Sequence, residues 1–116
     1  MTTQHIAALD LVAIHADGTR TPVALRVGAP APAATGDWHC ALRLEGLHDS
    51  LPSIHGDDSL QALCLALMCA ASVLRQFIAS GGRLIDTEES DDSADEASWP
   101  LEAYFGWLGA SRARGV

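Results

Sequence analysis

Three stretches in the first half of the chain have patterns of apolar and polar positions that predict β-strands. Residues 5–16 and 20–28 are rich in β-forming residues and flank the turn sequence DGT at 17–19, which predicts a β-hairpin. Residues 37–47 alternate most clearly and predict a third strand. Its apolar side is formed by Trp38, Cys40, Leu42 and Leu44.

The hairpin register follows from keeping apolar residues on one side of the sheet. Pairing Asp10 with Arg26 does this and lets the two charges meet on the other side. That register needs a loop with an odd number of residues, such as 17–19. A two-residue turn would instead place Asp10 beside Leu25, so we expect the longer loop or a β-bulge.

The second half of the chain switches to a helical period. Residues 29–36 and 48–56 are rich in proline and small or polar residues and predict loops. A long apolar helix then spans about 58–80, ending before a Gly-Gly pair that favours helix termination. The sequence RLID at 83–86 predicts a short fourth strand at a sheet edge.

The helix has a side that we expect to pack on the sheet, but its opposite side is not uniformly polar. Leu65 and Met68 lie among the polar residues of that opposite side, so something is expected to cover the first half of the helix. The side expected to face the sheet contains Leu60, Leu63, Leu67, Ala70, Leu74, Phe77 and Ile78.

The C-terminal sequence SWPLEAYFGWLG is the candidate cover. Ser98 is placed to cap a short helix with Pro100 in its first turn. This helix would be apolar on two sides and would need two neighbours, the long helix and a second subunit or partner. One side carries Leu101, Phe105 and Leu108, and the other Pro100, Tyr104 and Trp107.

These elements predict an α+β fold in the order β-β-β-α-β, with an antiparallel sheet of three to four strands, one long helix on its face and a short C-terminal helical segment. The 116 residues suit a single domain, 1–116. Within it, 87–97 is expected to be an acidic loop and 110–116 a tail.

Composition excludes several classes of function. Seven of the fifteen acidic residues lie in 86–96, and removing their charge from the net −8 leaves −1 for the rest of the chain. There is no lysine, and the seven arginines are scattered, so no basic stripe is available for nucleic acid. The helix is predicted to be buried, so we expect no membrane partner. Three cysteines without a C-x-x-C pair and no signal-peptide pattern lead us to expect a cytoplasmic protein.

The residues of 48–58 could carry chemistry or could simply start the helix. A small enzyme or ligand or metal binder would use His48, His55 and Asp57, but their spacing matches no metal or catalytic motif. With Asp58 as N-cap, Gln61 falls at the third helical position and completes a capping box. Capping is the preferred interpretation, and we assign no catalytic, cofactor-binding or metal-binding residue.

The pattern W-x-C followed by I-x-G-x-D-S-x-Q-A-L-x-L-A-L resembles a family of small uncharacterised bacterial proteins, over residues 37–85. The resemblance implies no activity. Small acidic bacterial domains of this kind include immunity proteins that neutralise toxins, which is an analogy of class and not of mechanism. The matching residues are Trp38, Cys40, Ile54, Gly56, Asp58, Ser59, Gln61, Ala62, Leu63, Leu65, Ala66 and Leu67.

The preferred functional hypothesis is therefore a non-catalytic protein-interaction domain that self-associates as a homodimer or binds another protein, with an immunity-like role as a special case. The alternative hypothesis is the small enzyme or ligand binder described above. The residues predicted to contact a partner are Leu65, Met68, Trp99, Tyr104 and Trp107.

Overall fold

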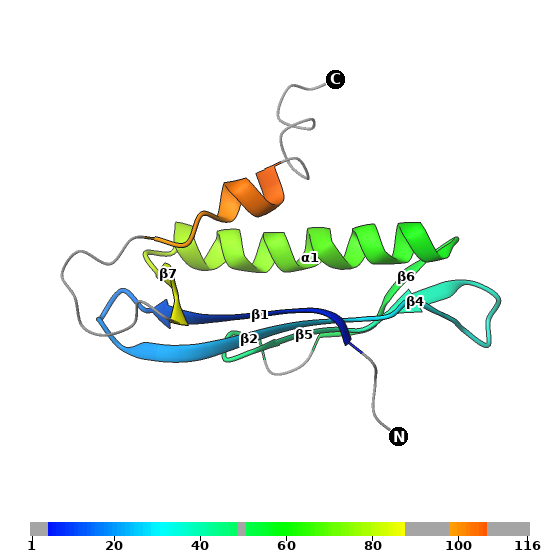
Figure 1. The fold of residues 1–116 in the computed structure, drawn as a ribbon, viewed down its shortest axis with the longest axis horizontal. Coiled ribbons are helices and arrows are strands. Elements are labelled where there is room, and N and C mark those ends of the chain that lie inside the picture. The colour runs from blue at the N-terminus through cyan, green and yellow to red at the C-terminus, as the bar shows by residue number, and fades with distance from the viewer. Residues whose placement is uncertain (1–4, 49–50, 88–97, 107–116) are drawn as a thin grey trace.

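The computed structural model describes residues 5–48, 51–87 and 98–106, and its α+β architecture confirms the predicted fold class (Figure 1). One long helix lies along two antiparallel sheets, and a six-residue helix at 101–106 lies on the helix. The elements are β1 (His5–Ile14), β2 (Arg20–Gly28), β3 (Ala31–Pro32), β4 (Trp38–Cys40), β5 (Leu42–Glu45), β6 (Ile54–Gly56), α1 (Ser59–Ala79) and β7 (Arg83–Asp86).

The larger sheet has the strand order β5-β2-β1-β7, with every pair antiparallel. It contains the predicted three-strand meander and the predicted fourth strand at an edge. β7 pairs with only the last four residues of β1, from Leu11 to Ile14. The other six residues of β1, 5–10, therefore have no β7 residue beside them.

The hairpin register differs from the prediction by two residues. Asp10 lies opposite Ala24 and not opposite Arg26, and the loop is 16–18, closed by a hydrogen bond from His15 N to Thr19 O of 2.8 Å. The loop still has an odd length, and Gly18 supplies its positive φ of 91°. The charges meet diagonally, because the Arg26 side chain spans two positions to reach Asp10 Oδ1 at 2.8 Å.

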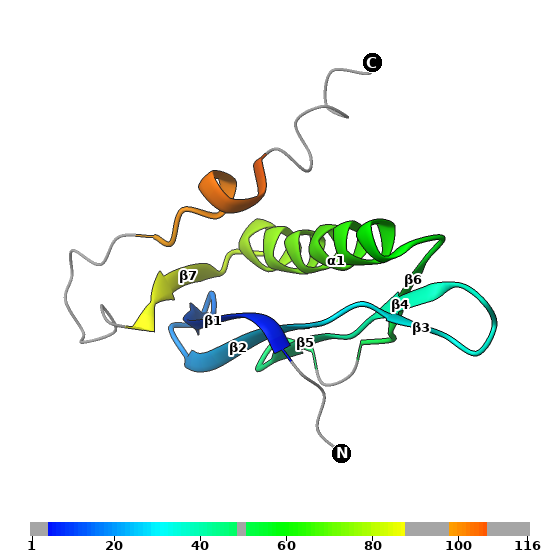
Figure 2. The same ribbon diagram turned by 45° about the vertical axis from the view of Figure 1, so that its right-hand side comes forward.

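The third predicted strand is divided between two sheets. It breaks at Ala41, so that β5 joins the larger sheet while β4 pairs with β3 and β6 in a smaller one (Figure 2). Ala41 O accepts a hydrogen bond from Gly28 N at 2.9 Å, which joins the two sheets into one bent ribbon. The predicted loops 29–36 and 48–56 thus contain the short strands β3 and β6, whose two or three residues are too few to show a period.

Both ends of α1 agree with the prediction. Asp58 is the N-cap and accepts from Gln61 N at 2.7 Å. The Gln61 side chain in turn accepts a hydrogen bond of 2.6 Å from the N–H of Asp57, the residue before the N-cap. At the other end, Gly81 has φ 105° and donates its N–H to Ile78 O.

The side of α1 that packs on the sheets is rotated from the predicted one. Leu60 and Ile78 were expected to face the sheet, but they are 68% and 39% exposed. The fully buried positions are mostly alanines, because small side chains let the helix approach the sheets closely. They are Ala62, Ala66, Ala70, Ala71 and Leu74, while Leu63, Leu67 and Phe77 are partly buried beside them.

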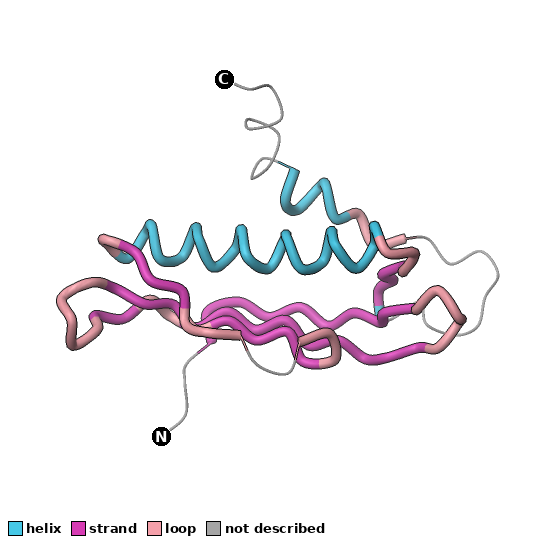
Figure 3. Tube along the Cα trace, turned by 180° about the vertical axis from the view of Figure 1, so that it is seen from behind, coloured by secondary structure: helices cyan, strands magenta, loops and turns pink. Residues whose placement is uncertain are grey.

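The C-terminal segment packs on α1 as predicted, but it begins differently. Ser98 does not cap a helix; it forms a β-bridge with Ile85, and Trp99 N donates to Leu84 O at 2.7 Å. Leu101 and Phe105 are buried against the core. The segment lies over the second half of α1, and not over the first half that was expected to be covered (Figures 1 and 3).

The rotated helix predicts which leucine supports the core. Leu74→Ala should lower the free energy of unfolding by about 2–5 kcal/mol, because it removes buried methyl groups and leaves a cavity. Leu60→Ala, an exposed change of the same kind on the same helix, should cost far less. Urea titration of both variants measures this, and equal losses would contradict the assigned helix orientation.

Candidate functional site

The three residues of the alternative, catalytic hypothesis do not form one site. His48 lines a hollow of about 300 Å³ with residues of the second half of α1, from Val73 to Ser80. His55 lies on β6, which packs at the start of α1, where Gly56 meets Ala62. At 1.5 Å rise per residue the two histidines are separated by roughly 20 Å of helix. Asp57 is exposed, and its N–H serves the helix cap.

The polar cluster that does form was missed by the sequence analysis. His55 Nδ1 lies 2.8 Å from Asp37 Oδ2, and Thr35 Oγ1 donates to Asp37 Oδ1. The rings of His55 and His39 lie 6.0 Å apart because β4 and β6 pair these two residues directly. Nothing local in the sequence indicates this pairing, since it depends on β6.

The cluster joins the strands of the smaller sheet, and its electrostatics follow from its hydrogen bonds. The pKa of Asp37 is lowered, first by the hydrogen bond from Thr35 and then by the one from His55. Within the described part of the chain, no group of three or more His, Cys, Asp or Glu residues is placed to hold a metal ion. We therefore interpret the cluster as a cross-strand link.

The cysteines are placed as core or partly covered residues. Cys40 is fully buried, and its Sγ lies 3.2 Å from Gly28 O, which accepts the thiol hydrogen. Burial raises the pKa of Cys40 above its usual value, which disfavours the thiolate. Cys64 and Cys69 are free and half-buried on α1. Cys40 in particular lacks the exposure and the lowered pKa of a nucleophile.

An apolar surface lies on the first half of α1, on the side away from the sheets. We call it the outer α1 surface and define it as Leu60, Cys64, Leu65 and Met68. Leu60 is 68% and Leu65 36% exposed; Cys64 and Met68 are half-buried, and part of Met68 packs against the core. The four residues lie on adjacent turns, so their side chains form one patch. Its position contains two of the residues predicted to contact a partner.

The other residues predicted to contact a partner lie on or beyond the short helix. Trp99 is buried within its own chain, with its ring 4.6 Å from the ring of Tyr104. Tyr104 is 51% exposed. Trp107 and Leu108 lie outside the described residues, as do 88–97 of the predicted acidic loop and the 110–116 tail. The partner-binding role of these residues stays a prediction.

Arg75 holds the short helix on α1. Its guanidinium donates to both carboxylate oxygens of Glu102 at 3.0 Å and to Phe105 O at 2.8 Å. The same bonds lower the pKa of Glu102 and raise that of Arg75. A hollow of about 490 Å³ lies beside this contact, between Ile78 and Ala79 of α1 and residues 100–103. Arg75 is therefore bonded within its own chain, and the outer α1 surface stops before it.

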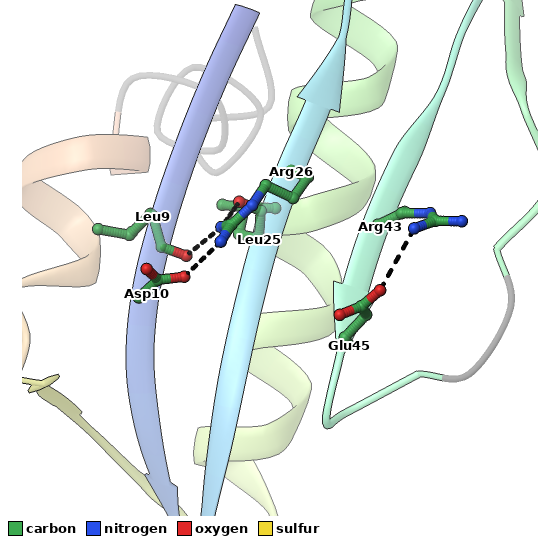
Figure 4. Close-up of polar contacts among 6 residues, drawn as sticks. All are labelled: Leu9, Asp10, Leu25, Arg26, Arg43 and Glu45. Atoms are coloured by element: carbon green, nitrogen blue, oxygen red, sulfur yellow. Dashed lines mark hydrogen bonds and ion pairs between the residues drawn. The ribbon is translucent and has the colours of Figure 1, made fainter. Parts of the chain in front are cut away.

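The sheet face opposite α1 carries neutralised charges (Figure 4). Arg26 binds Asp10 at 2.8 Å, and Arg43 lies 3.3 Å from Glu45 on β5. Arg26 and Arg43 lie opposite each other in the β2–β5 pair, and their side chains point in opposite directions toward their acids. Arg26 and Arg43 are therefore each paired with a carboxylate of the same sheet.

Comparison with known proteins gives a family but no activity. Residues 11–95 match the family model of a domain of unknown function, DUF6968. This range contains the W-x-C and helix pattern that indicated an uncharacterised family. No curated protein and no solved structure matches the chain significantly.

The Asp37 cluster predicts a pH effect. Because the folded-state pKa of Asp37 is lowered, its hydrogen bonds stabilise the fold above the ordinary aspartate pKa, and this contribution is lost as the pH falls through the lowered pKa. Thr35→Ala should raise the pKa of Asp37 toward its ordinary value, as measured by NMR titration of the carboxyl carbon. An unchanged pKa would show that Thr35 is not the main cause.

Proposed function

The chain belongs to the DUF6968 family, a family without an assigned activity, and we propose that it is a non-catalytic protein-interaction domain that self-associates. The observation that supports this proposal is the outer α1 surface. An immunity-like role, in which the domain binds a toxin, is a special case that a neighbouring toxin gene would support.

The helix is more apolar than its packing against the described residues of the chain requires. Its most apolar 18-residue window has a mean hydropathy of 1.9, so by length and composition alone α1 could cross a membrane. In the structure one side packs on the sheets, and the short helix covers part of the second half. A helix that carries apolar residues on its outer side as well needs more cover than a helix with a single apolar side. A second protein surface over Leu60, Cys64, Leu65 and Met68 would complete that burial.

The distribution of charge also favours association. The acidic run at 86–96 carries most of the net charge, and the remaining −1 lets two folded bodies approach with little repulsion. Burial of apolar side chains contributes about 25 cal/mol for each Å² removed from water. Exposed apolar residues scattered singly need no explanation, whereas large contiguous apolar patches are typical of sites where proteins interact. The grouping of four apolar residues on adjacent turns supports the second interpretation.

The geometry gives less support to the alternative of a small enzyme or ligand binder that uses His48, His55 and Asp57. His48 and His55 lie toward opposite ends of α1, and Asp57 serves the helix cap. The His55–Asp37 pair joins β6 to the residue that precedes β4, and Thr35 binds the same aspartate, so both Asp37 carboxylate oxygens and His55 Nδ1 are already bonded within the chain.

Self-association can be tested by sedimentation equilibrium of the full chain. The wild type should form a species of twice the 12.2 kDa chain mass. Leu65→Ser should weaken the assembly about tenfold, because it removes an apolar contact from the interface. Ile78→Ser is the matched control, because Ile78 lies on the same helix with similar exposure, 39% against 36%, but outside the outer α1 surface.

A wild-type chain that stays monomeric over the full concentration range would contradict the proposed self-association. Equal weakening by Leu65→Ser and Ile78→Ser would contradict the assignment of the outer α1 surface, because the effect would then not depend on position.

A further inference from the structure

The first half of β1 is an open sheet edge in the described part of the chain. β2 pairs with β1 along one side from His5 to Ile14, but β7 pairs along the other side only from Leu11 to Ile14. Residues 5–10 thus have a described neighbour on one side only (Figures 1 and 2). An open edge is a template for another strand.

The hydrogen-bonding groups at this edge can be assigned from the hairpin. His15 N bonds Thr19 O, and in an antiparallel pair such hydrogen-bonded positions recur at every second residue. Odd-numbered residues of β1 from Ala7 onward therefore turn their N–H and C=O toward β2. The N–H and C=O of Ala8 and Asp10 point toward the open edge.

Apart from a bulge between His5 and Ala7, the edge has few of the usual devices that prevent strand addition. The chain has no lysine, and β1 contains no proline. Asp10 is the one formally charged residue of this half of β1, and its Oδ1 is already bound by Arg26. Ala7 and Ala8 are small and exposed, which lets another backbone approach.

A bulge makes this edge complementary to itself. The register shifts between His5 and Ala7, so that His5 lies opposite Gly28 and occupies the ladder position directly before Ala7. Ladder positions on the face opposite α1 then belong to His5, Ala8 and Asp10, whose β2 partners are Gly28, Arg26 and Ala24. On this face His5 and Asp10 lie at equal ladder distances from Ala8. One end therefore carries a histidine and the other a carboxylate, which can pair with each other.

We propose that a second copy of the chain adds its β1 to this edge, antiparallel and about a two-fold axis at Ala8, so that the two larger sheets join into one. This rests on the proposed self-association and specifies its geometry. In this register Ala8 meets Ala8 of the partner subunit, and Ala7 meets Leu9 of the partner subunit. His5 meets Asp10 of the partner subunit at both ends, and Asp10 Oδ2 is available to accept the histidine N–H.

A second copy fits this edge better than an unrelated peptide. A two-fold dimer would form the histidine–aspartate pair twice, once at each end of the paired strands, whereas an arbitrary strand would form it once at most. The alignment also sets the hydrogen-bonding groups of Ala8 and Asp10 opposite groups that point outward on the second copy. A two-fold axis normal to the sheet keeps both α1 helices on one face, so the same second copy can also contact the outer α1 surface.

Two substitutions of Ala8 test this geometry by sedimentation equilibrium of the full chain. Ala8→Glu lies opposite Arg26 within its own chain, which favours the fold, but it would set two carboxylates face to face at the axis. We expect the dimer dissociation constant to rise by at least roughly tenfold. Ala8→Gln has the same size without the charge and should stay within about threefold of the wild type. Circular dichroism checks that both variants fold.

The outcomes separate this inference from the proposed function. If the wild type assembles and Ala8→Glu assembles equally well, the β1 pairing is wrong and self-association stands. A loss of assembly in Ala8→Gln equal to that in Ala8→Glu would also overturn the pairing at Ala8, because charge would not be the cause. A monomeric wild type overturns both proposals.

Discussion

The close approach of α1 to the sheets is the constraint on which the rest of the structure depends. Ala62, Ala66 and Ala70 line the contact, and Gly56 of β6 lies so near that a Cβ there would be 2.5 Å from Ala62 N. A helix seated on small residues can approach closely, but it cannot turn its leucines inward at the same positions. The larger side chains are therefore placed on the flanks or on the outside.

This constraint explains the outer α1 surface. Leu60 and Leu65 are exposed because the inward positions next to them are taken by Ala62 and Ala66. The short C-terminal helix covers part of α1 through Leu101 and Phe105, and Arg75 fixes it there by binding Glu102. The first half of the helix is left with an apolar surface that a second protein surface could bury.

The larger sheet, like α1, has more neighbouring residues at one end than at the other. At one end β7 and the Ser98 bridge extend the sheet beyond β1, while at the other end β1 is the last described strand. The bent ribbon joins the smaller sheet to β2 and β5, on the side away from β1. The open edge of β1 and the outer α1 surface thus both lack a neighbour among the described residues.

Local patterns predicted most of the fold. β-forming residues around the DGT turn predicted the hairpin, alternation predicted the strand at 37–47, and Asp58 with Gln61 predicted the helix start. All three signals depend on residues close in sequence. The register of β1 was wrong by two residues because a long arginine can reach an aspartate diagonally. The packed side of α1 was predicted in part: Ala70 and Leu74 are buried as expected, whereas Leu60 and Ile78 are exposed. The prediction gave leucines more weight than alanines, although close packing selects small residues.

What the sequence did not predict depends on distant residues. β3 and β6 are too short to show a period, and the contact of His55 with Asp37 exists only because β6 pairs with β4. The candidate surface was predicted in part: Leu65 and Met68 stood out as apolar residues on a polar side. The open edge of β1 needed the length of β7 and the bulge at His5, which only the structure provides.

Amide hydrogen exchange of the full chain, compared between concentrated and dilute samples, tests the central claim most directly. Assembly through β1 predicts that the N–H groups of Ala8 and Asp10 are protected in the concentrated sample and exchange rapidly on dilution. The N–H of Leu9, which bonds β2, should stay protected in both. Rapid exchange of Ala8 and Asp10 at every concentration at which the chain is associated would contradict the account.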